Sequence, residues 1–565
     1  MPEHCVNLMI AGAAGQGLST VGQLLARSLV RGGHEVLVRQ DFMSRVRGGH
    51  NTFLIRAADF PLDAPREPLD LLMALNQEGV DLHLEELAPG GMVFADAGLD
   101  LRDAPGRSVP FAGLAPKPIF QNVAALGVLA GILGLDPAIP KALLGETFAA
   151  KGRDVVARNH EVLDAAYAWV REQAPPFAPL APVADPPRRL MLTGNEALAL
   201  GALAAGVNFC SYYPMTPGTS IAQTLTSHGR ELGVVVEQAE DEIAAMNMAV
   251  GAAYAGARAL VPTSGGGFAL MTEAVSLAGV TETPIVCAVA QRPGPATGMA
   301  TRTEQADLNL VIHAGHGEFP RAVFAPGTVE EFFLLTHRAF DLAERFQSPV
   351  FVLSDQYMAN SYRSVAPFDP QALPAPAEPL RRWTADEPYA RYAVTEDGVS
   401  PRLLPGFTDQ LVLADSHEHV PSGHMTEDAR MRTAMQDKRL RKGQGLLAEA
   451  VDPTWDGPPA PELMLVCWGS TRGAALEAAR ELRARGRAVG VLHFAQVWPL
   501  RPERFMGRFE AAGRTVCVEG NSTGQFEALL RQHGCLRLDG HIRKYDGRTF
   551  TPEYILRGLD ALGLA

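Results

Sequence analysis

The chain has 565 residues, of which 47% are hydrophobic and 20% charged, and its formal net charge is −13. At about 150 residues per domain, this length predicts three or four domains. The acidic balance excludes a general nucleic-acid binder, which needs a basic face. No apolar run reaches the roughly 18 residues that a membrane span needs. The opening residues MPEHCVNL lack the features of a secretory signal, so we expect a cytoplasmic protein.

Proline clusters divide the chain into segments. The stretch APPFAPLAPVADPP cannot hold a helix or a central strand and is typical of an extended linker. Two further irregular stretches lie near residues 366–407 and 452–461. The predicted divisions are a first domain, a Pro-rich linker, a second domain, an irregular connecting segment and a last domain, at residues 1–172, 173–188, 189–365, 366–460 and 461–565.

Each folded segment opens with an apolar, β-rich run, a small-residue turn and an alanine-rich helix. The first segment shows VNLMIAG before such a helix, and the last shows LMLVCWGS before one and AVGVLHF after it. This order at this spacing predicts parallel βαβ units. The fold class is therefore α/β, with three doubly wound domains.

Candidate metal ligands do not form an ordered site in the sequence. The six cysteines are scattered and no CxxC pair occurs, which excludes iron–sulfur and zinc-finger spacings in this chain. His417 and His419, with His424 nearby, lie in an irregular segment without an ordered partner. Histidines that face solvent or a ligand are the better interpretation, and we expect no metal site.

A glycine motif, GAAGQG at residues 12–17, follows the first strand and opens a helix. Glycines there free backbone N–H groups to face an anion such as a phosphate. A tight turn that needs glycine for packing is the alternative. Arg45, Arg47 and the sequence GGH at 48–50 form a basic loop that either faces the same anion or is solvated.

Three patterns in the second domain are typical of a ligand site. The loop YPMTPGTS at residues 213–220 is stiffened by two prolines around Thr216, which suits binding, although a capped helix start is the alternative. Four carboxylates between Glu237 and Glu242 precede an apolar helix, and one buried there can transfer protons. Arg292 follows an apolar strand, where doubly wound sheets bind ligands, unless it is an exposed loop arginine. The turn TSGGGF at 263–268 is either phosphate-binding or merely tight.

Together these segments resemble the 2-oxoacid:ferredoxin oxidoreductases, which use thiamine diphosphate. GAAGQGLSTVGQLLARSLVRGGHEV and RVRGGHNTFLIR are similar to the γ domain of that family. YPMTPGTS, EDEIAAMNMAVGAAYAG, TSGGGFALM and QRPGPATG resemble its pyrimidine-binding domain. VCWGSTRGAALEAARELRARG and KYDGRTFTPEYI resemble a transketolase C-terminal-like domain. The resemblance covers nearly the whole chain and implies an α subunit with a γ domain fused in front.

The resemblance also implies roles for single residues. Thr216 matches the threonine that contacts substrate and cofactor, with Tyr213 and Pro214 beside it. Glu242 matches the glutamate that hydrogen-bonds the aminopyrimidine ring and thereby promotes deprotonation of the thiazolium carbon. Arg292 matches the arginine that holds the 2-oxoacid carboxylate. The residues expected to contact coenzyme A or another anion are Gly15, Gln16, Gly17 and Arg47.

The resemblance further implies that this chain carries half of an active site. No GDG motif is present for holding the diphosphate through Mg²⁺, and the cysteines cannot hold a [4Fe–4S] cluster. A separate β subunit is expected to supply both, in an (αβ)₂ heterotetramer that reduces ferredoxin.

The expected reaction is oxidative decarboxylation of 2-oxoglutarate to succinyl-CoA, or its CO₂-fixing reverse. Pyruvate, branched-chain oxoacids and indolepyruvate are alternative substrates. A non-catalytic scaffold subunit is an alternative function. A nicotinamide dehydrogenase fits poorly, because the glycines at 12–17 lack the dinucleotide spacing.

Overall fold

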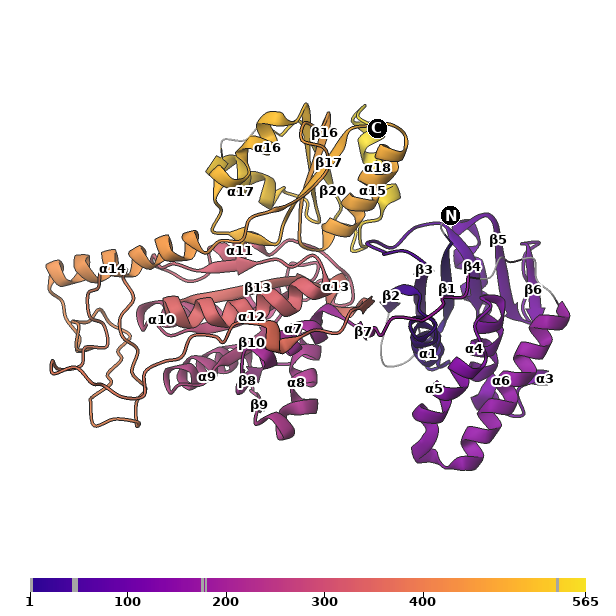
Figure 1. Ribbon diagram of the computed structural model, residues 1–565, viewed down its shortest axis with the longest axis horizontal. Coiled ribbons are helices and arrows are strands. Elements are labelled where there is room, and N and C mark those ends of the chain that lie inside the picture. Colours follow the sequence, from indigo (N-terminus) through magenta and orange to yellow (C-terminus); the bar gives the residue numbers. More distant parts are fainter. Residues whose placement is uncertain (1–3, 43–48, 174–176, 178–179, 535–537) are drawn as a thin grey trace. The chain divides into compact units, whose positions relative to one another are not determined.

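The chain folds into two compact units, which are described separately (Figure 1). The computed structural model describes residues 4–42, 49–173, 177, 180–534 and 538–565. Unit 1 comprises Met1–Leu192, Ser361–Phe368 and Thr551–Glu553, and unit 2 comprises Thr193–Asn360, Asp369–Phe550 and Tyr554–Ala565.

Unit 1 contains an eight-stranded sheet of order β6-β5-β4-β1-β3-β2-β14-β7. Its strands are β1 (Cys5–Ala13), β2 (Glu35–Phe42), β3 (His50–Ala58), β4 (Leu69–Ala74), β5 (Leu87–Asp96), β6 (Gly106–Val109), β7 (Leu190–Leu192) and β14 (Tyr362–Val365). The strands from β6 to β1 are parallel, whereas those from β1 to β7 are antiparallel. The antiparallel half was not part of the predicted βαβ pattern. It arises because the connection between β2 and β3 is too short for a parallel crossover.

In the described part of unit 1, the α-helices are α1 (Leu18–Arg31), α2 (Gln77–His83), α3 (Phe111–Leu114), α4 (Gln121–Ile132), α5 (Ala138–Phe148) and α6 (Arg153–Gln173). Helix α4 takes up most of the longest apolar run of the chain and is buried around most of its circumference. Such all-round hydrophobicity is expected of a core helix. Among the described residues, no helix combines the length and the apolar character that crossing a membrane requires.

The first sheet of unit 2 has seven strands in the order β18-β12-β13-β11-β10-β8-β9. They are β8 (Phe209–Tyr212), β9 (Val235–Gln238), β10 (Ala259–Thr263), β11 (Ile285–Gln291), β12 (Ala322–Phe324), β13 (Pro349–Asp355) and β18 (Gln496–Trp498). All are parallel except β18. Strands β11 and β13 are buried along their whole length, as expected of central parallel strands covered on both faces.

The helices of this region are α7 (Gly194–Ala204), α8 (Thr219–Leu232), α9 (Glu242–Tyr254), α10 (Gly265–Val280), α11 (Leu308–Ile312), α12 (Val329–Phe346) and α13 (Gln356–Asn360). The second sheet of unit 2 has the order β15-β17-β16-β19-β20 and is parallel except for β15. Its strands are β15 (Thr454–Asp456), β16 (Leu463–Trp468), β17 (Val489–Phe494), β19 (Arg514–Glu519) and β20 (Gly540–Arg543). Its helices are α15 (Arg472–Ala484), α16 (Met506–Ala511), α17 (Gln525–Gly534) and α18 (Pro552–Ala561).

The structure differs from the predicted divisions at two places. Strands β7 and β14, which the sequence assigned to the second domain, pair with each other, and β14 extends the sheet of unit 1 at the edge of β2. An edge strand offers unpaired backbone groups; β14 pairs with those of β2, and β7 pairs with those of β14. The segment 366–460 is not irregular throughout, because it contains the 20-residue helix α14 (Ala429–Ala448). The remaining boundaries stay predictions.

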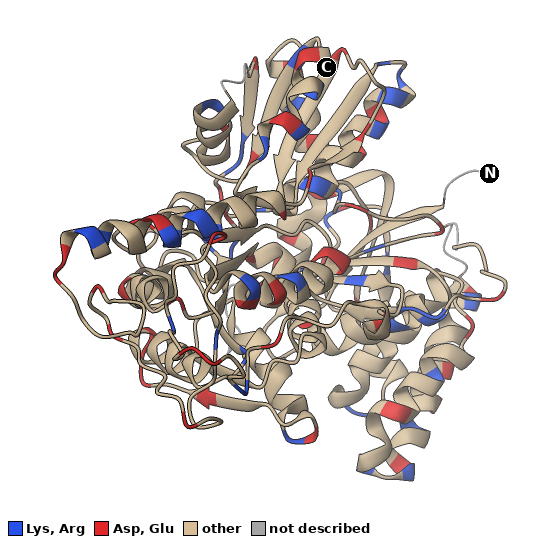
Figure 2. Cartoon of the chain, turned by 60° about the vertical axis from the view of Figure 1, so that its left-hand side comes forward, with Lys and Arg blue, Asp and Glu red and all other residues tan. Residues whose placement is uncertain are grey.

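A buried ionic cluster attaches α14 to the rest of unit 2. This helix carries several basic residues (Figure 2), and Lys438 and Lys442 donate to the carboxylate of Glu282 at 2.7 and 2.9 Å. All three side chains are at most 1% exposed. Burial raises the pKa of Glu282, but the charges of the two lysines and of Arg391 outweigh it and hold that pKa well below its usual range. These ion pairs explain why α14, which is polar in sequence, has buried lysines.

We predict that Glu282→Ala strongly destabilises unit 2. The substitution leaves two lysines buried without their counter-ion, which costs about 3–5 kcal/mol in comparable cases. Denaturant-induced unfolding followed by circular dichroism measures the change. The matched control is Glu503→Ala, which removes an exposed partner of Arg501 and should leave the unfolding midpoint near that of the wild type. Equal midpoints for both variants would contradict the prediction.

Candidate functional site

The candidate residues of the second domain meet at one edge of the seven-stranded sheet. Strands β8, β9, β10 and β11 are parallel, so their carboxyl ends share this edge. The loop 213–218 follows β8, Glu242 follows β9, the first turn of α10 follows β10, and Arg292 follows β11. Open parallel sheets bind ligands at this edge. The sequence predicted that each of these residues follows a strand; their joint role in one site stays a prediction.

Glu242 is the acid that the fold selects from the four carboxylates. It is 4% exposed, and its Oε1 atom is buried without a hydrogen-bond partner. Asp241 instead caps α9 by accepting a hydrogen bond from the backbone N–H of Ala244 at 2.7 Å, and Glu237 and Glu240 are exposed. An unpartnered buried carboxylate oxygen is costly. Of these four carboxylates, Glu242 is therefore the one that can accept a hydrogen bond from a buried ligand.

The glycines of the TSGGGF turn make room for carboxyl groups. A Cβ atom at Gly267 would overlap the hydroxyl of Thr263 and lie 2.8 Å from Oε1 of Glu242. A Cβ at Gly265 would overlap the carboxylate of Asp307. Both glycines lie inside α10 and neither has a positive φ. The sequence left phosphate binding and tight packing as the two interpretations of this turn. The structure adds a third, because the glycines allow the carboxyl groups of Glu242 and Asp307 to approach α10 closely.

Arg292 is buried, which excludes the exposed loop arginine that the sequence left open. It is 8% exposed and its guanidinium Nη1 donates to the backbone carbonyl of Thr216 at 2.7 Å. The Nε atom is buried without a partner. Burial lowers the pKa of Arg292, and the nearby Asp307 carboxyl opposes that shift. The arginine thus retains donor capacity beside the Thr216 loop.

The Thr216 loop is hydrogen-bonded at its C-terminal end and exposed at its N-terminal end. The side-chain amide of Asn195 donates to the carbonyl of Pro217 at 2.9 Å and to the hydroxyl of Ser220 at 2.8 Å. Thr216 is partly buried, whereas Tyr213 is 37% exposed and Pro214 is exposed. The loop is therefore rigid at its base, as its prolines predict, and accessible at its tip.

Sequence reasoning missed the contribution of segment 303–309. Gln305 is buried, donates to the carbonyl of Trp468 at 3.0 Å and accepts from the N–H of Gly520 at 2.8 Å. This clamp from the last domain holds Asp307 next to α10. An aspartate before a short helix reads as an ordinary N-cap, so no sequence signal distinguishes it.

The glycine motif of unit 1 forms the expected turn, but Gln16 has an internal role. Gly15 and Gly17 have φ of 93° and 75°, values that favour glycine. The side-chain oxygen of Gln16 accepts from the N–H of Ala13 at 2.7 Å, so it braces the loop. Arg45 and Arg47 lie outside the described residues.

The three candidate histidines of segment 417–424 do not converge. His417 is paired with Asp415, and His424 with Ser422. His419 is fully buried against Tyr392, with ring centroids 3.8 Å apart. Within the described ranges, no group of three or more His, Cys, Asp and Glu residues is arranged to hold a metal ion.

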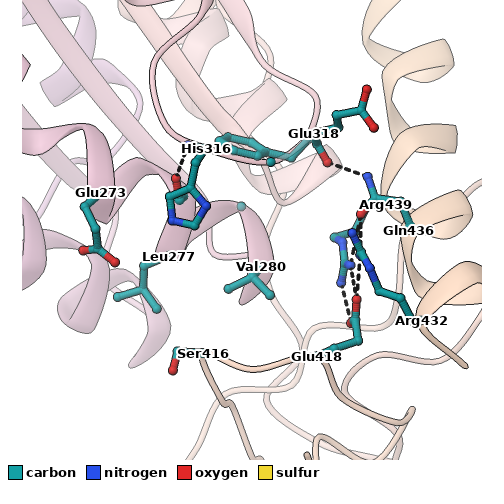
Figure 3. A pocket seen from close by; sticks show the side chains of 14 residues that line it. Glu273, Leu277, Val280, His316, Glu318, Ser416, Glu418, Arg432, Gln436 and Arg439 are labelled. Atoms are coloured by element: carbon teal, nitrogen blue, oxygen red, sulfur yellow. Dashed lines mark hydrogen bonds and ion pairs between the residues drawn. The ribbon is translucent and has the colours of Figure 1, made fainter. Parts of the chain in front are cut away.

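A separate pocket of about 270 Å³ lies at the other end of α10 (Figure 3). Leu277 and Val280 line one side, and Arg432 and Arg439 lie opposite. Both guanidinium groups bind the carboxylate of Glu418, so one of their two positive charges is compensated. None of the candidate site residues lines this pocket.

Known proteins share this organisation over nearly the whole chain. A family described as pyruvate flavodoxin/ferredoxin oxidoreductase, thiamine diphosphate-binding, matches residues 200–438. Pyruvate ferredoxin/flavodoxin oxidoreductase matches residues 7–169, and the transketolase C-terminal domain matches residues 457–553.

Relatives and a solved structure agree with these matches. Subunit alpha of 2-oxoacid:ferredoxin oxidoreductase 2 from Aeropyrum pernix is 32% identical over 96% of this chain and 95% of its own. The 2-oxoglutarate oxidoreductase subunit KorA of Mycobacterium tuberculosis is 28% identical over 93% and 87%. The 2-oxoglutarate:ferredoxin oxidoreductase of Magnetococcus marinus, solved with 2-oxoglutarate, coenzyme A and succinyl-CoA bound, superposes with a TM-score of 0.93 at 29% identity over 99% of both chains. The chain belongs to the α-subunit family of the 2-oxoacid:ferredoxin oxidoreductases.

Proposed function

We propose that this chain, together with a separate β subunit, decarboxylates 2-oxoglutarate oxidatively to succinyl-CoA and passes the electrons to ferredoxin, or runs the reverse reaction. The observation that carries the proposal is the buried carboxylate of Glu242, whose Oε1 atom has no hydrogen-bond partner, at the same sheet edge as Arg292. The choice of 2-oxoglutarate is supported by the names of the Mycobacterium and Magnetococcus relatives.

The residues present fit thiamine diphosphate. Oε1 of Glu242 lacks a donor, and a ring nitrogen of the aminopyrimidine that carries a proton supplies one. Gly267 leaves the space in which this carboxylate lies, and Thr216, with Tyr213 and Pro214, borders the site. Bound thiamine diphosphate supplies a carbon nucleophile for 2-oxoacids. The task of Glu242 is to hold a proton at its Oε1 atom and so set the protonation state of the ring.

Arg292 is the proposed holder of the substrate carboxylate. Its Nη1 is committed to Thr216, while its Nε has no partner within the described chain. A charge-assisted hydrogen bond to a carboxylate satisfies such a donor. Such a contact would fix the position and orientation of the 2-oxoacid at the site.

The proposed β subunit docks where α9 and α10 expose apolar side chains. Ile243, Met248 and Leu270 are 50%, 39% and 52% exposed, and a Cβ at the exposed Gly251 would meet open space. Glycine inside an exposed helix costs stability, which a closely packed partner offsets. The Mg²⁺ and diphosphate site and the [4Fe–4S] cluster are assigned to that subunit, because this sequence has neither a GDG motif nor a cysteine cluster. An (αβ)₂ assembly is proposed with it.

Coenzyme A is the proposed ligand of the unit 1 glycine loop. The backbone of Gly15 and Gly17 adopts the left-handed turn, and Gln16 stiffens it. This turn offers backbone N–H groups to phosphate groups, and Arg47 is the proposed source of a guanidinium.

A panel of 2-oxoacids with the co-purified complex tests the proposed function. We expect coenzyme A-dependent reduction of a viologen dye with 2-oxoglutarate at a kcat/KM at least about tenfold above that with pyruvate, branched-chain oxoacids or indolepyruvate. Glu242→Ala is expected to lower turnover by about 10²-fold or more, since proton transfer by a positioned group contributes that much. A different preferred oxoacid would correct the substrate, and unchanged turnover of Glu242→Ala would favour a scaffold.

Two adjacent glycines provide a matched test of the cofactor site. Gly267→Ala is expected to displace Glu242 and reduce turnover about 10²-fold, because misplacement by about 1 Å has such effects. Gly266→Ala lies in the same turn, where the nearest atom is the carbonyl of Ala296 at 3.5 Å, and should stay near the wild type. Steady-state turnover rates of the two purified variant complexes test this prediction. An equal loss of turnover in both variants would indicate a general effect on α10.

Arg47→Ala tests the coenzyme A assignment. The loss of one charge-assisted hydrogen bond, worth about 1.5–3 kcal/mol, should raise the KM for coenzyme A more than tenfold. The KM for the 2-oxoacid should stay within about twofold. A change confined to the 2-oxoacid would place coenzyme A elsewhere.

A further inference from the structure

A second carboxyl group, that of Asp307, lies at the candidate site. Asp307 occupies the N-cap position of α11, but its side chain makes no capping hydrogen bond. Its Oδ2 atom is buried and has no hydrogen-bond partner. This oxygen lies where a Cβ of Gly265 would be. The carboxyl group therefore points to the first turn of α10, on which Glu242 also borders through Gly267.

The position of Asp307 is fixed by its backbone. Its N–H donates to the side-chain oxygen of Gln291 at 2.9 Å, and Gln291 directly precedes Arg292. The Gln305 clamp holds the preceding turn, and the side chain of Gln525 donates to the carbonyl of Ala306 at 2.7 Å. These contacts hold the backbone of Asp307, while its Oδ2 atom stays buried without a hydrogen-bond partner.

The charges around Asp307 come from three elements. Arg292 lies at the end of β11, Glu304 precedes Asp307 on the same segment, and Glu242 lies across the first turn of α10. That turn and α11 carry no ionisable side chain. Burial raises the pKa of Asp307 to about 6, although Arg292 opposes the shift. When ionised, Asp307 therefore competes with an anionic ligand for the charge of Arg292.

We propose that Asp307 is a positioning residue that couples substrate binding to a proton: the carboxylate of the 2-oxoacid binds at Arg292 when Asp307 is protonated. The proposal rests on the proposed function, in which Arg292 receives that carboxylate. Binding converts the Asp307 carboxylate and one solvent proton into the neutral acid, and no bond of the substrate changes. Below about pH 6 the acid is already neutral and affinity is constant; above it, each bound substrate takes up a proton, so affinity falls as pH rises.

The test is the pH dependence of KM in the active complex. Between about pH 6 and about pH 8, the wild type should show a KM for 2-oxoglutarate that rises tenfold or more. Asp307→Asn keeps the shape without the ionisation, so its KM should vary less than about twofold over the same range. The matched control Glu304→Gln should keep the slope of the wild type. A retained slope in Asp307→Asn, or a lost one in Glu304→Gln, overturns the proposal.

Calorimetry gives a second readout that does not depend on turnover or on a variant. With the wild-type complex free of thiamine diphosphate, titration of 2-oxoglutarate at about pH 7.5 in two buffers of different ionisation enthalpy should reveal uptake of nearly one proton. No proton uptake overturns the proposal. A complex that turns over none of the 2-oxoacids contradicts the proposed function instead. In that case the measured proton uptake on its own tests the role of Asp307.

Discussion

The second domain depends on one costly arrangement, a carboxylate oxygen buried without a donor. Glu242 is 4% exposed and its Oε1 has no partner in the described chain. An unpaired buried polar atom costs free energy of the order of 1–3 kcal/mol, more when it is charged. Such a cost is stored at functional sites, where a ligand relieves it. The surrounding features are best understood as the means of holding this group in place.

Three features of the fold maintain the arrangement. Asp241 takes the capping position of α9, so Glu242 is left free of that role. Gly267 has no side chain, so the space beside the Glu242 carboxylate stays free. The last domain adds the Gln305 clamp, which fixes the segment that carries Asp307 against α10. The transketolase C-terminal-like domain thus contacts this segment through backbone groups of Trp468 and Gly520.

The sequence located the strand ends that carry the candidate residues, because a pattern of strand, turn and helix is local information. An apolar run followed by a small-residue turn and a helix places Thr216, Glu242 and Arg292 at strand ends, and parallel strands bring such ends together. The family resemblance added their roles. The sequence did not reveal the clamp at Gln305 or the position of Asp307, because both depend on contacts more than 150 residues away or on the absence of a side chain at Gly265. It also left α14 unpredicted, since that helix is polar in sequence and its buried face depends on Glu282.

The most direct test of the central claim is a structure of the two-subunit complex with thiamine diphosphate. We predict a ring nitrogen of the aminopyrimidine within hydrogen-bond distance of Oε1 of Glu242, about 2.6–3.2 Å, and the diphosphate held by the partner subunit. A cofactor bound away from Glu242, or a diphosphate held by residues of this chain, would contradict it.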